Sequence, residues 1–296
     1  RGGATGGGQG RRVMGNALGI DVGGSKTLLA LVEGDQVLDE LTLPTARAEG
    51  AARWCDDIAG AARRWEGRFS VVGAAVTGTI YGGRWSALNP VTLPVPADFP
   101  LEAELSARLG CPVRAWNDAQ AAAWGEHRFG AGNGGDLVFV TVSTGIGGGA
   151  VVGGKLLVGL SGIAASVGQV RLGLTAGTKR IEDEASGQWI ASAAHAAGQA
   201  TDARGVFVAA AGGADWARAI VATSAERVAV LLVNLRLLFD PPVIVLGGGV
   251  GLAPGYADAV RAELRQSYPV RLRPDLRLAA LGPRAGVLGA ADLAIT

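Results

Sequence analysis

Two glycine-rich loops with the same flanking pattern occur in this chain, one within IDVGGSKT at 20–27 and one within VTVSTGIGGG at 140–149. In each, an apolar run typical of a buried strand ends at a small polar residue and several glycines. Because glycine has no Cβ, backbone N–H groups in such a loop can close around phosphate oxygens. After each loop the chain continues as expected strands, TLLALV and VLDELTL after the first, AVV and KLLVG after the second. The repetition predicts a duplicated fold that clamps a nucleotide.

The continuation after the second loop separates two classes of nucleotide-binding protein. Residues 145–150, GIGGGA, match the dinucleotide fingerprint G-x-G-x-x-G/A, but that motif requires a helix to open at the loop, and a strand is expected here. A tight hairpin corner is the plain alternative for any single loop. A third glycine cluster follows the expected strand at 243–246. The three together favour an α/β actin-like ATPase, the duplicated two-domain, ribonuclease H-like fold of sugar kinases.

Charge and hydropathy favour a small-molecule partner. The 27 Lys and Arg residues balance 26 Asp and Glu residues, so no basic field is available for nucleic acid or for a membrane surface. The longest apolar stretch, residues 228–239, is interrupted by Asn234 and Arg236 and is too short to span a membrane. We expect it to be a buried helix.

The cysteines and the first residues bear on localisation. Cys55 and Cys111 are the two cysteines and form no CxxC pair, which predicts no disulfide framework and a reducing, cytoplasmic location. Residues 1–16 are rich in Gly and Arg, contain no apolar stretch typical of a secretory signal, and are expected to be a disordered leader.

The pattern of strands and helices predicts two domains. Residues 17–118 would form the first and 119–282 the second, and an apolar helix within 283–296 would return to the first. The Pro- and Gly-rich run at 78–100 is too long and irregular for a plain connection, and loops of this kind tend to carry binding residues.

Asn117 and Asp118 are the candidate pair for chemistry. A sugar hydroxyl that attacks the γ-phosphate of ATP must lose its proton, and a carboxylate at the end of a strand between two domains can accept it. An Asp before the Ala-rich stretch at 119–127 is also a good helix N-cap. The position of the pair between the two glycine loops favours the catalytic interpretation.

Five motifs in order resemble those of the ROK family of bacterial sugar kinases. They cover the chain from Leu18 onward and are IDVGGSKT, VTGTIYGGRWSALNP (76–90), WNDAQAAAWGE (116–126), VFVTVSTGIGGG (138–149) and VIVLGGGVGLAPGY (243–256). Within the family, ALNP, NDAQAAAW and GLAPGY are most similar to the members that act on N-acetylmannosamine.

The resemblance implies a role for each matching residue. The sugar ligands would be Asn89, Asn117, Asp118, Ser166, Gln169 and Glu182, with Asp118 as the catalytic base. ATP would be held by Asp21, Gly23, Gly24, Ser25 and Lys26 in the first loop, by Thr144, Gly145, Gly147 and Gly148 in the second, and by Gly247, Gly248 and Gly249 on the adenosine side. Asp21 would lie near Mg²⁺. A solvated surface carboxylate is the alternative for Glu182.

The chain departs from the family pattern in the segment that follows the second loop. Ser166 stands where a charged or imidazole sugar ligand is usual, and Gln169 stands where a histidine commonly binds zinc and orients the sugar. The Cys-rich zinc loop is replaced by LGLTAGTKR (172–180), so the usual Cys₃His site cannot form. We expect His127 and His195 to be packing or surface residues of helices, and no zinc site.

The resemblance implies transfer of the γ-phosphate of Mg-ATP to O6 of an acylated hexosamine, with N-acetylmannosamine of sialic acid breakdown as the first candidate. A glucokinase-like or N-acetylglucosamine kinase of the same family is one alternative, and a non-catalytic sugar sensor is another. About 20 residues precede Asp21, from which no DNA-binding domain is expected. A homodimer is also implied.

Overall fold

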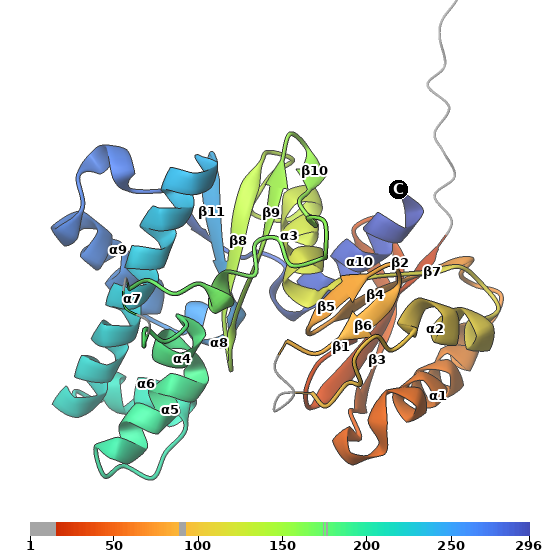
Figure 1. Cartoon of the computed structure of the whole chain (residues 1–296), viewed down its shortest axis with the longest axis horizontal. Helices are drawn as coiled ribbons and strands as arrows, with labels where there is room; N and C mark the ends of the chain where they lie inside the picture. The colour runs from red at the N-terminus through yellow and green to blue at the C-terminus, as the bar shows by residue number, and fades with distance from the viewer. Residues whose placement is uncertain (1–15, 89–92, 174, 176) are drawn as a thin grey trace, which may run out of the picture.

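The computed structural model describes residues 16–296, apart from 89–92, 174 and 176. The chain forms two halves, each built on a five-stranded sheet, and they lie beside one another with the helices α3 and α10 between them (Figure 1).

The first sheet has the strand order β3-β2-β1-β4-β7. An antiparallel meander supplies three strands, and two later strands add in parallel beside β1. The strands are β1 (Ala17–Val22), β2 (Lys26–Glu33), β3 (Gln36–Pro44), β4 (Val71–Val76) and β7 (Val113–Asn117).

The second sheet repeats this plan in the order β10-β9-β8-β11-β12. Its strands are β8 (Leu137–Val142), β9 (Ile146–Val152), β10 (Lys155–Leu156), β11 (Val243–Gly247) and β12 (Leu276–Leu278). Again the first three strands form an antiparallel meander and the last two are parallel to β8. The predicted duplication is confirmed, and no helix opens after the second glycine loop, so the dinucleotide fingerprint is excluded.

Different helices cover the two sheets. The first half carries η1 (Arg47–Glu49), α1 (Gly50–Ala62), η2 (Arg63–Trp65), α2 (Leu101–Leu109) and a hairpin of β5 (Thr79–Tyr81) and β6 (Arg84–Ser86). The second half carries η3 (Val167–Gln169), α4 (Glu182–Ala185), α5 (Gly187–Ala196), α6 (Ala203–Ala211), α7 (Asp215–Phe239), α8 (Gly248–Gly251), α9 (Tyr256–Ser267), η4 (Val270–Leu272) and η5 (Gly282–Arg284). Gly110 ends α2 in the left-handed conformation that glycine adopts readily.

Two helices join the halves. α3 (Asp118–Phe129) follows the last strand of the first sheet but packs on β8 and β9, whereas α10 (Ala285–Ile295) follows the second sheet but packs on β1 and β4. The two helices also pack on one another, where a Cβ at Gly289 would lie 1.8 Å from the Ala121 carbonyl oxygen. Only glycine permits so close an approach.

One prediction about burial was partly wrong. Residues 228–239 are the second part of α7 and are largely buried up to Leu235, but Leu237 and Leu238 are 61% and 76% exposed. Leu237 and Leu238 lie in the last turn of α7, on a side of the helix that is not packed against the core. Within the described part of the chain, no helix is long and apolar enough to cross a membrane.

Candidate active site

A cavity of about 1360 Å³ is lined by residues of both halves. Of the predicted site residues, those that line it are Gly23, Gly24, Ser25, Asn117, Asp118, Thr144, Gly145, Gly147, Gly148, Ser166, Gln169, Glu182 and Gly249. Asp21, Lys26, Gly247 and Gly248 are close to these residues in the chain but are not in the lining. Asn89 lies outside the described residues. The fold thus brings the two glycine loops, the Asn-Asp pair and the segment after the second loop to one place.

The first glycine loop is a tight connection between β1 and β2. The Gly23 N–H donates to the Lys26 carbonyl at 3.0 Å, and the Thr45 hydroxyl donates to the Gly23 carbonyl at 3.0 Å. The Thr45 N–H donates to the Ser25 carbonyl, also at 3.0 Å. Thr45, directly after β3, therefore holds this loop through two hydrogen bonds, and Gly23, Gly24 and Ser25 of the loop line the cavity.

The second glycine loop, between β8 and β9, is held by the start of α5 and by Glu182. The Gly187 N–H donates to the Ser143 carbonyl at 2.7 Å, and the Gln188 N–H donates to the Thr144 carbonyl at 3.1 Å. The Ile146 N–H donates to Oε2 of Glu182 at 3.0 Å. The loop is therefore held at Ser143, Thr144 and Ile146 by contacts within the protein.

Most of the third glycine cluster, residues 247–249, lies outside the cavity lining. Gly247 ends β11 and Gly248 begins α8. A Cβ at Gly248, whose φ is +86°, would lie 2.3 Å from the Val142 carbonyl oxygen. Of the three glycines, only Gly249 contributes to the lining of the cavity.

Asn117, rather than Asp118, caps α3. The side-chain Oδ1 of Asn117 accepts from the N–H groups of Ala119 and Gln120 at 3.0 and 3.1 Å, and its side-chain Nδ2 donates to the Gly78 carbonyl at 2.8 Å. Asp118 is the first residue of the helix, and its Oδ1 accepts from the Ala119 N–H at 2.8 Å. The capping role foreseen for Asp118 thus falls to its neighbour.

Burial raises the pKa of Asp118, and the negative charge of Glu182 adds to the shift, while hydrogen bonds from Ala119 and Asn117 oppose it. The pKa of Asp21 is raised to about 7, first by burial and then by the charge of Asp118, against the opposing charge of Lys26. Two carboxylates from different segments thus influence one another at the edge of the cavity.

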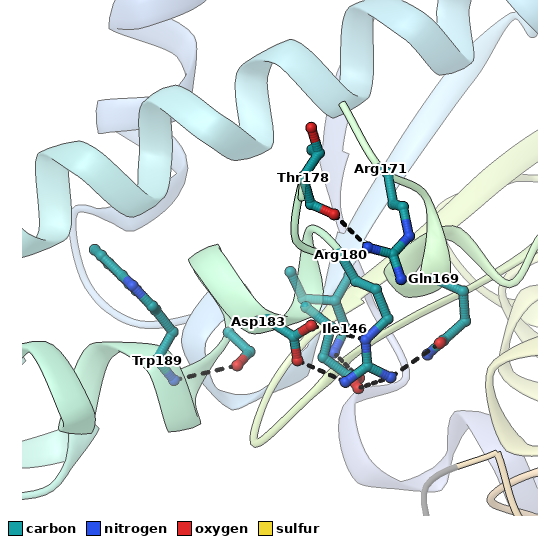
Figure 2. A network of polar contacts seen from close by, with 9 residues as sticks. Ile146, Gln169, Arg171, Thr178, Arg180, Asp183 and Trp189 are labelled. Atoms are coloured by element: carbon teal, nitrogen blue, oxygen red, sulfur yellow. Dashed lines mark hydrogen bonds and ion pairs between the residues drawn. The ribbon is translucent and has the colours of Figure 1, made fainter. Parts of the chain in front are cut away.

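Glu182 is no solvated surface carboxylate, since its side chain is 17% exposed and it lies in the cavity wall. Gln169 accepts a hydrogen bond from Arg180 through its Oε1 at 3.1 Å (Figure 2). His127 is buried on α3 with Nδ1 2.9 Å from the Gly135 carbonyl oxygen, and His195 is exposed on α5. Neither lines the cavity. In the described part of the chain, no group of three or more His, Cys, Asp or Glu side chains could hold a metal ion.

Several lining residues were not predicted as site residues. Thr77 and Gly78 follow the parallel strand β4 at its carboxyl end, a position that often carries binding residues, and this signal could have found them. Arg204, Phe207 and the other lining residues of α6 carry no such signal, because their spacing is that of an ordinary packed helix.

The fold and cavity are those of an actin-like α/β ATPase in which two glycine loops line one cavity. The sequence profile of the ROK family matches residues 17–296, and the chain belongs to this family. It is 48% identical over 279 residues to a bifunctional enzyme NanE/NanK of Brucella melitensis, covering 94% of this chain and 54% of that protein. The chain therefore spans about half the length of this curated relative.

Two further comparisons cover nearly the whole of both chains. An N-acetylmannosamine kinase of Shigella boydii is 39% identical over 284 residues, which is 94% of this chain and 97% of the relative. The crystal structure of a ROK hexokinase from Thermus thermophilus matches with a TM-score of 0.81 at 35% identity, covering 94% of this chain and 97% of that one. The resemblance inferred from the five motifs is confirmed.

Proposed function

We propose that this protein is an ATP-dependent sugar kinase that phosphorylates O6 of an acylated hexosamine, with N-acetylmannosamine as its substrate. The observation that carries the proposal is the half-buried carboxylate of Asp118 in a cavity whose walls include both glycine loops. The similarity to curated N-acetylmannosamine kinase sequences supports the choice of sugar.

In this proposal, Asp118 accepts the proton of the attacking sugar hydroxyl. Its raised pKa makes it a better base than an exposed aspartate, because catalytic efficiency rises as the pKa approaches the working pH. The backbone N–H groups of the loops at Gly24, Gly145 and Gly147 would hold the phosphates. We propose that the two domains, 17–118 with 283–296 and 119–282, close around the substrates and exclude water.

Magnesium fits the residues present. Mg²⁺ is usually bound by one or two carboxylates together with phosphate oxygens and water, and Asp21 offers one carboxylate directly before the first loop. When bound, the ion would neutralise charge on the phosphates. Lys26 lies near Asp21 and would favour the ionised carboxylate.

A related kinase of unmodified hexoses is the second candidate, supported by the similarity to a ROK hexokinase. The two differ in what the sugar carries at C2, and the cavity wall with Ser166, Gln169 and Glu182 would distinguish them. In either case we propose a homodimer in the cytoplasm, where ATP is available. Sedimentation would test the oligomeric state.

The experiment that tests the proposal is an assay of ADP release from Mg-ATP with N-acetylmannosamine, N-acetylglucosamine, glucose, mannose and fructose, each with the wild type and with Asp118→Asn. We expect turnover that is fastest with N-acetylmannosamine and nearly lost in the variant. Fastest turnover with glucose would establish the second candidate. No sugar-dependent ADP release from any of the five, with sugar binding retained, would identify a sensor instead.

A further inference from the structure

Arg180 is the centre of a polar network beside the cavity. It lies directly before α4 and donates to both carboxylate oxygens of Asp183, from Nε to Oδ2 at 2.8 Å and from Nη2 to Oδ1 at 2.6 Å. Its third nitrogen, Nη1, donates to Oε1 of Gln169 at 3.1 Å and lies 3.9 Å from Oε1 of Glu182. Figure 2 shows the guanidinium between Asp183 and Gln169. The Arg180 guanidinium thus links Asp183, which is outside the cavity lining, to Gln169 and Glu182, which are part of the lining.

The guanidinium determines which way the Gln169 amide faces. Arginine donates hydrogen bonds and accepts none, so the amide atom that meets Nη1 must be the oxygen. The two N–H donors of Gln169 are then left for other partners, and Gln169 lines the cavity. The wall therefore offers a ligand a donor at this position, where an unrestrained glutamine could offer either a donor or an acceptor.

Glu182 supplies the complementary group. Its Oε2 accepts from the Ile146 N–H of the second glycine loop, and its Oε1 is the oxygen nearest Arg180. A carboxylate accepts hydrogen bonds and donates none. Gln169 and Glu182 thus form a donor and an acceptor whose relative positions depend on Arg180.

The ion pair between Arg180 and Asp183 has two well-formed hydrogen bonds but contributes little to the free energy of unfolding. Asp183 is 37% exposed and Arg180 is 28% exposed, and pairs this accessible typically contribute less than about 1 kcal/mol. The surrounding segment is closed by other contacts, since Ile181 N–H donates to the Val170 carbonyl at 2.9 Å and Arg171 donates to the Thr178 carbonyl. Removal of the Arg180 side chain should therefore leave the fold intact.

We propose that Arg180 is a positioning residue for sugar recognition, which fixes Gln169 as a donor and Glu182 as an acceptor toward the sugar. This inference rests on the proposed sugar kinase activity. Its consequence is specificity for a sugar that presents an acceptor oxygen, such as a hydroxyl or an acyl carbonyl, to Gln169 and a hydroxyl to Glu182.

The test compares Arg180→Ala and Arg180→Lys with the wild type and with Arg171→Ala, a matched control that removes a guanidinium of the same segment without a contact to Gln169 or Glu182. We expect Arg180→Ala to raise the KM for the sugar by about 10- to 100-fold, the usual effect of losing a charge-assisted hydrogen bond. The KM for ATP and the melting temperature should stay close to those of the wild type. Arg180→Lys should be nearly as impaired, because an ammonium cannot donate to Asp183 and Gln169 in the same fork.

A double-mutant cycle separates positioning from a merely structural role. If Arg180 acts through Gln169, the double variant Arg180→Ala/Gln169→Ala should be little worse for the sugar KM than the worse of the two single variants. Gln169→Glu keeps a partner for Arg180 but loses the amide donor, and should raise the sugar KM without lowering the melting temperature. Fully additive effects on the KM, or equal effects of Arg171→Ala and Arg180→Ala, would overturn the inference.

The failure of this inference and that of the proposed function give different results. A wild type that turns over no sugar contradicts the proposed function itself. A wild type that is active, beside an Arg180→Ala variant with an unchanged sugar KM, contradicts only the role of Arg180.

Discussion

The two halves of the molecule have the same strand order but have been adapted differently. The fifth residue of β1 is Asp21, whereas the fifth residue of β8 is Thr141, so one glycine loop begins beside a carboxylate and the other beside a neutral hydroxyl. In the first half the meander ends with the nine-residue β3, and in the second it ends with the two-residue β10.

The short third strand of the second half has a direct structural result. After Leu156 the chain leaves the sheet and forms the segment 157–181, which places Ser166 and Gln169 in the cavity wall. In the first half, the corresponding chain extends β3 and supports the first loop through Thr45. The comparison teaches that the first sheet uses its long third strand to support a loop beside a carboxylate, while the second has a short third strand and is followed by a segment that lines the cavity.

The largest expected effect is on kcat and concerns Asp118, which begins the helix α3 between the two halves. Asp118→Asn should lower kcat by about 10²–10⁴, the usual contribution of a positioned base. The fold should be kept, because Asn117 caps α3 and the new amide oxygen can still accept from Ala119. Steady-state kinetics together with a melting curve provide the test. A variant with more than about a tenth of the wild-type rate would remove Asp118 from catalysis.

The second prediction compares the packing of α10 on β4 with the packing of α3 on β9. A Cβ at Gly73 in β4 would lie 1.9 Å from the Ala290 carbonyl oxygen, and one at Gly149 in β9 would lie 2.7 Å from the Ala123 Cβ. Gly73→Ala should therefore lower the free energy of unfolding by about 2–3 kcal/mol and Gly149→Ala by about 1–2 kcal/mol.

Gly60, within α1, is the matched control because a Cβ there would meet nothing within 4 Å. Gly60→Ala should raise stability by about 0.5–1 kcal/mol. Urea unfolding of the three variants measures the differences. Equal losses at Gly73 and Gly149 would show that the two helix-sheet contacts are equally adaptable.

The third prediction concerns the carboxylate that distinguishes the first loop. Because the pKa of Asp21 is about 7 in the folded protein, against an ordinary value of 3.8, the folded state binds a proton more tightly than the unfolded chain does. The contribution of Asp21 to stability is thus fully present below about pH 4 and is lost as the pH rises through 7.

Asp21→Asn should remove this dependence and be more stable than the wild type at pH 8, by an amount on the order of 2 kcal/mol. At pH 4 the two should differ little. Melting temperatures of both proteins across this range give the measurement. A stability difference that does not change with pH would contradict the raised pKa.

The smallest expected effect concerns metal in the second half. The segment that carries Ser166 and Gln169 is held by Arg180 and by backbone hydrogen bonds, and the residues expected for a Cys₃His zinc site are missing from the sequence. A zinc-selective chelator should leave the sugar KM unchanged when Mg²⁺ is supplied in excess. Metal analysis that finds about one zinc per chain would refute this prediction.

Much of the fold follows from sequence because its signals are local. The two meanders were predictable from alternating apolar runs with glycine turns between them, and the end of α2 from Gly110. The return of the helix within 283–296 to the first half was expected, but its close packing on α3 was not, because nothing local shows that Gly125 and Gly289 face the backbone of another helix. Such a contact depends on segments more than 150 residues apart in the chain.

The site shows the same division. The glycine loops and Asp118 could be proposed from their motifs, and the cavity brings them together. The sequence could not show that Asn117 rather than Asp118 caps α3, because either residue is a good N-cap. The backbone conformation at Asn117 determines which of the two caps the helix. Arg180 had no sequence signal either, because its partners Gln169 and Asp183 are ordinary polar residues until the fold places them around it.

The packing of α10 also has a consequence for synthesis of the protein. The helix covers β1 and β4, with Val287, Leu288 and Ala291 in one buried cluster with Ala17, Ala30 and Val32. Its residues are translated after all the described strands of both sheets, so the first sheet stays uncovered on that face until residues 283–296 have left the ribosome, although domains generally fold in the order in which they emerge. We expect a nascent chain stalled before residue 283 to be a target for chaperones and proteases, even though it already contains every strand of both sheets.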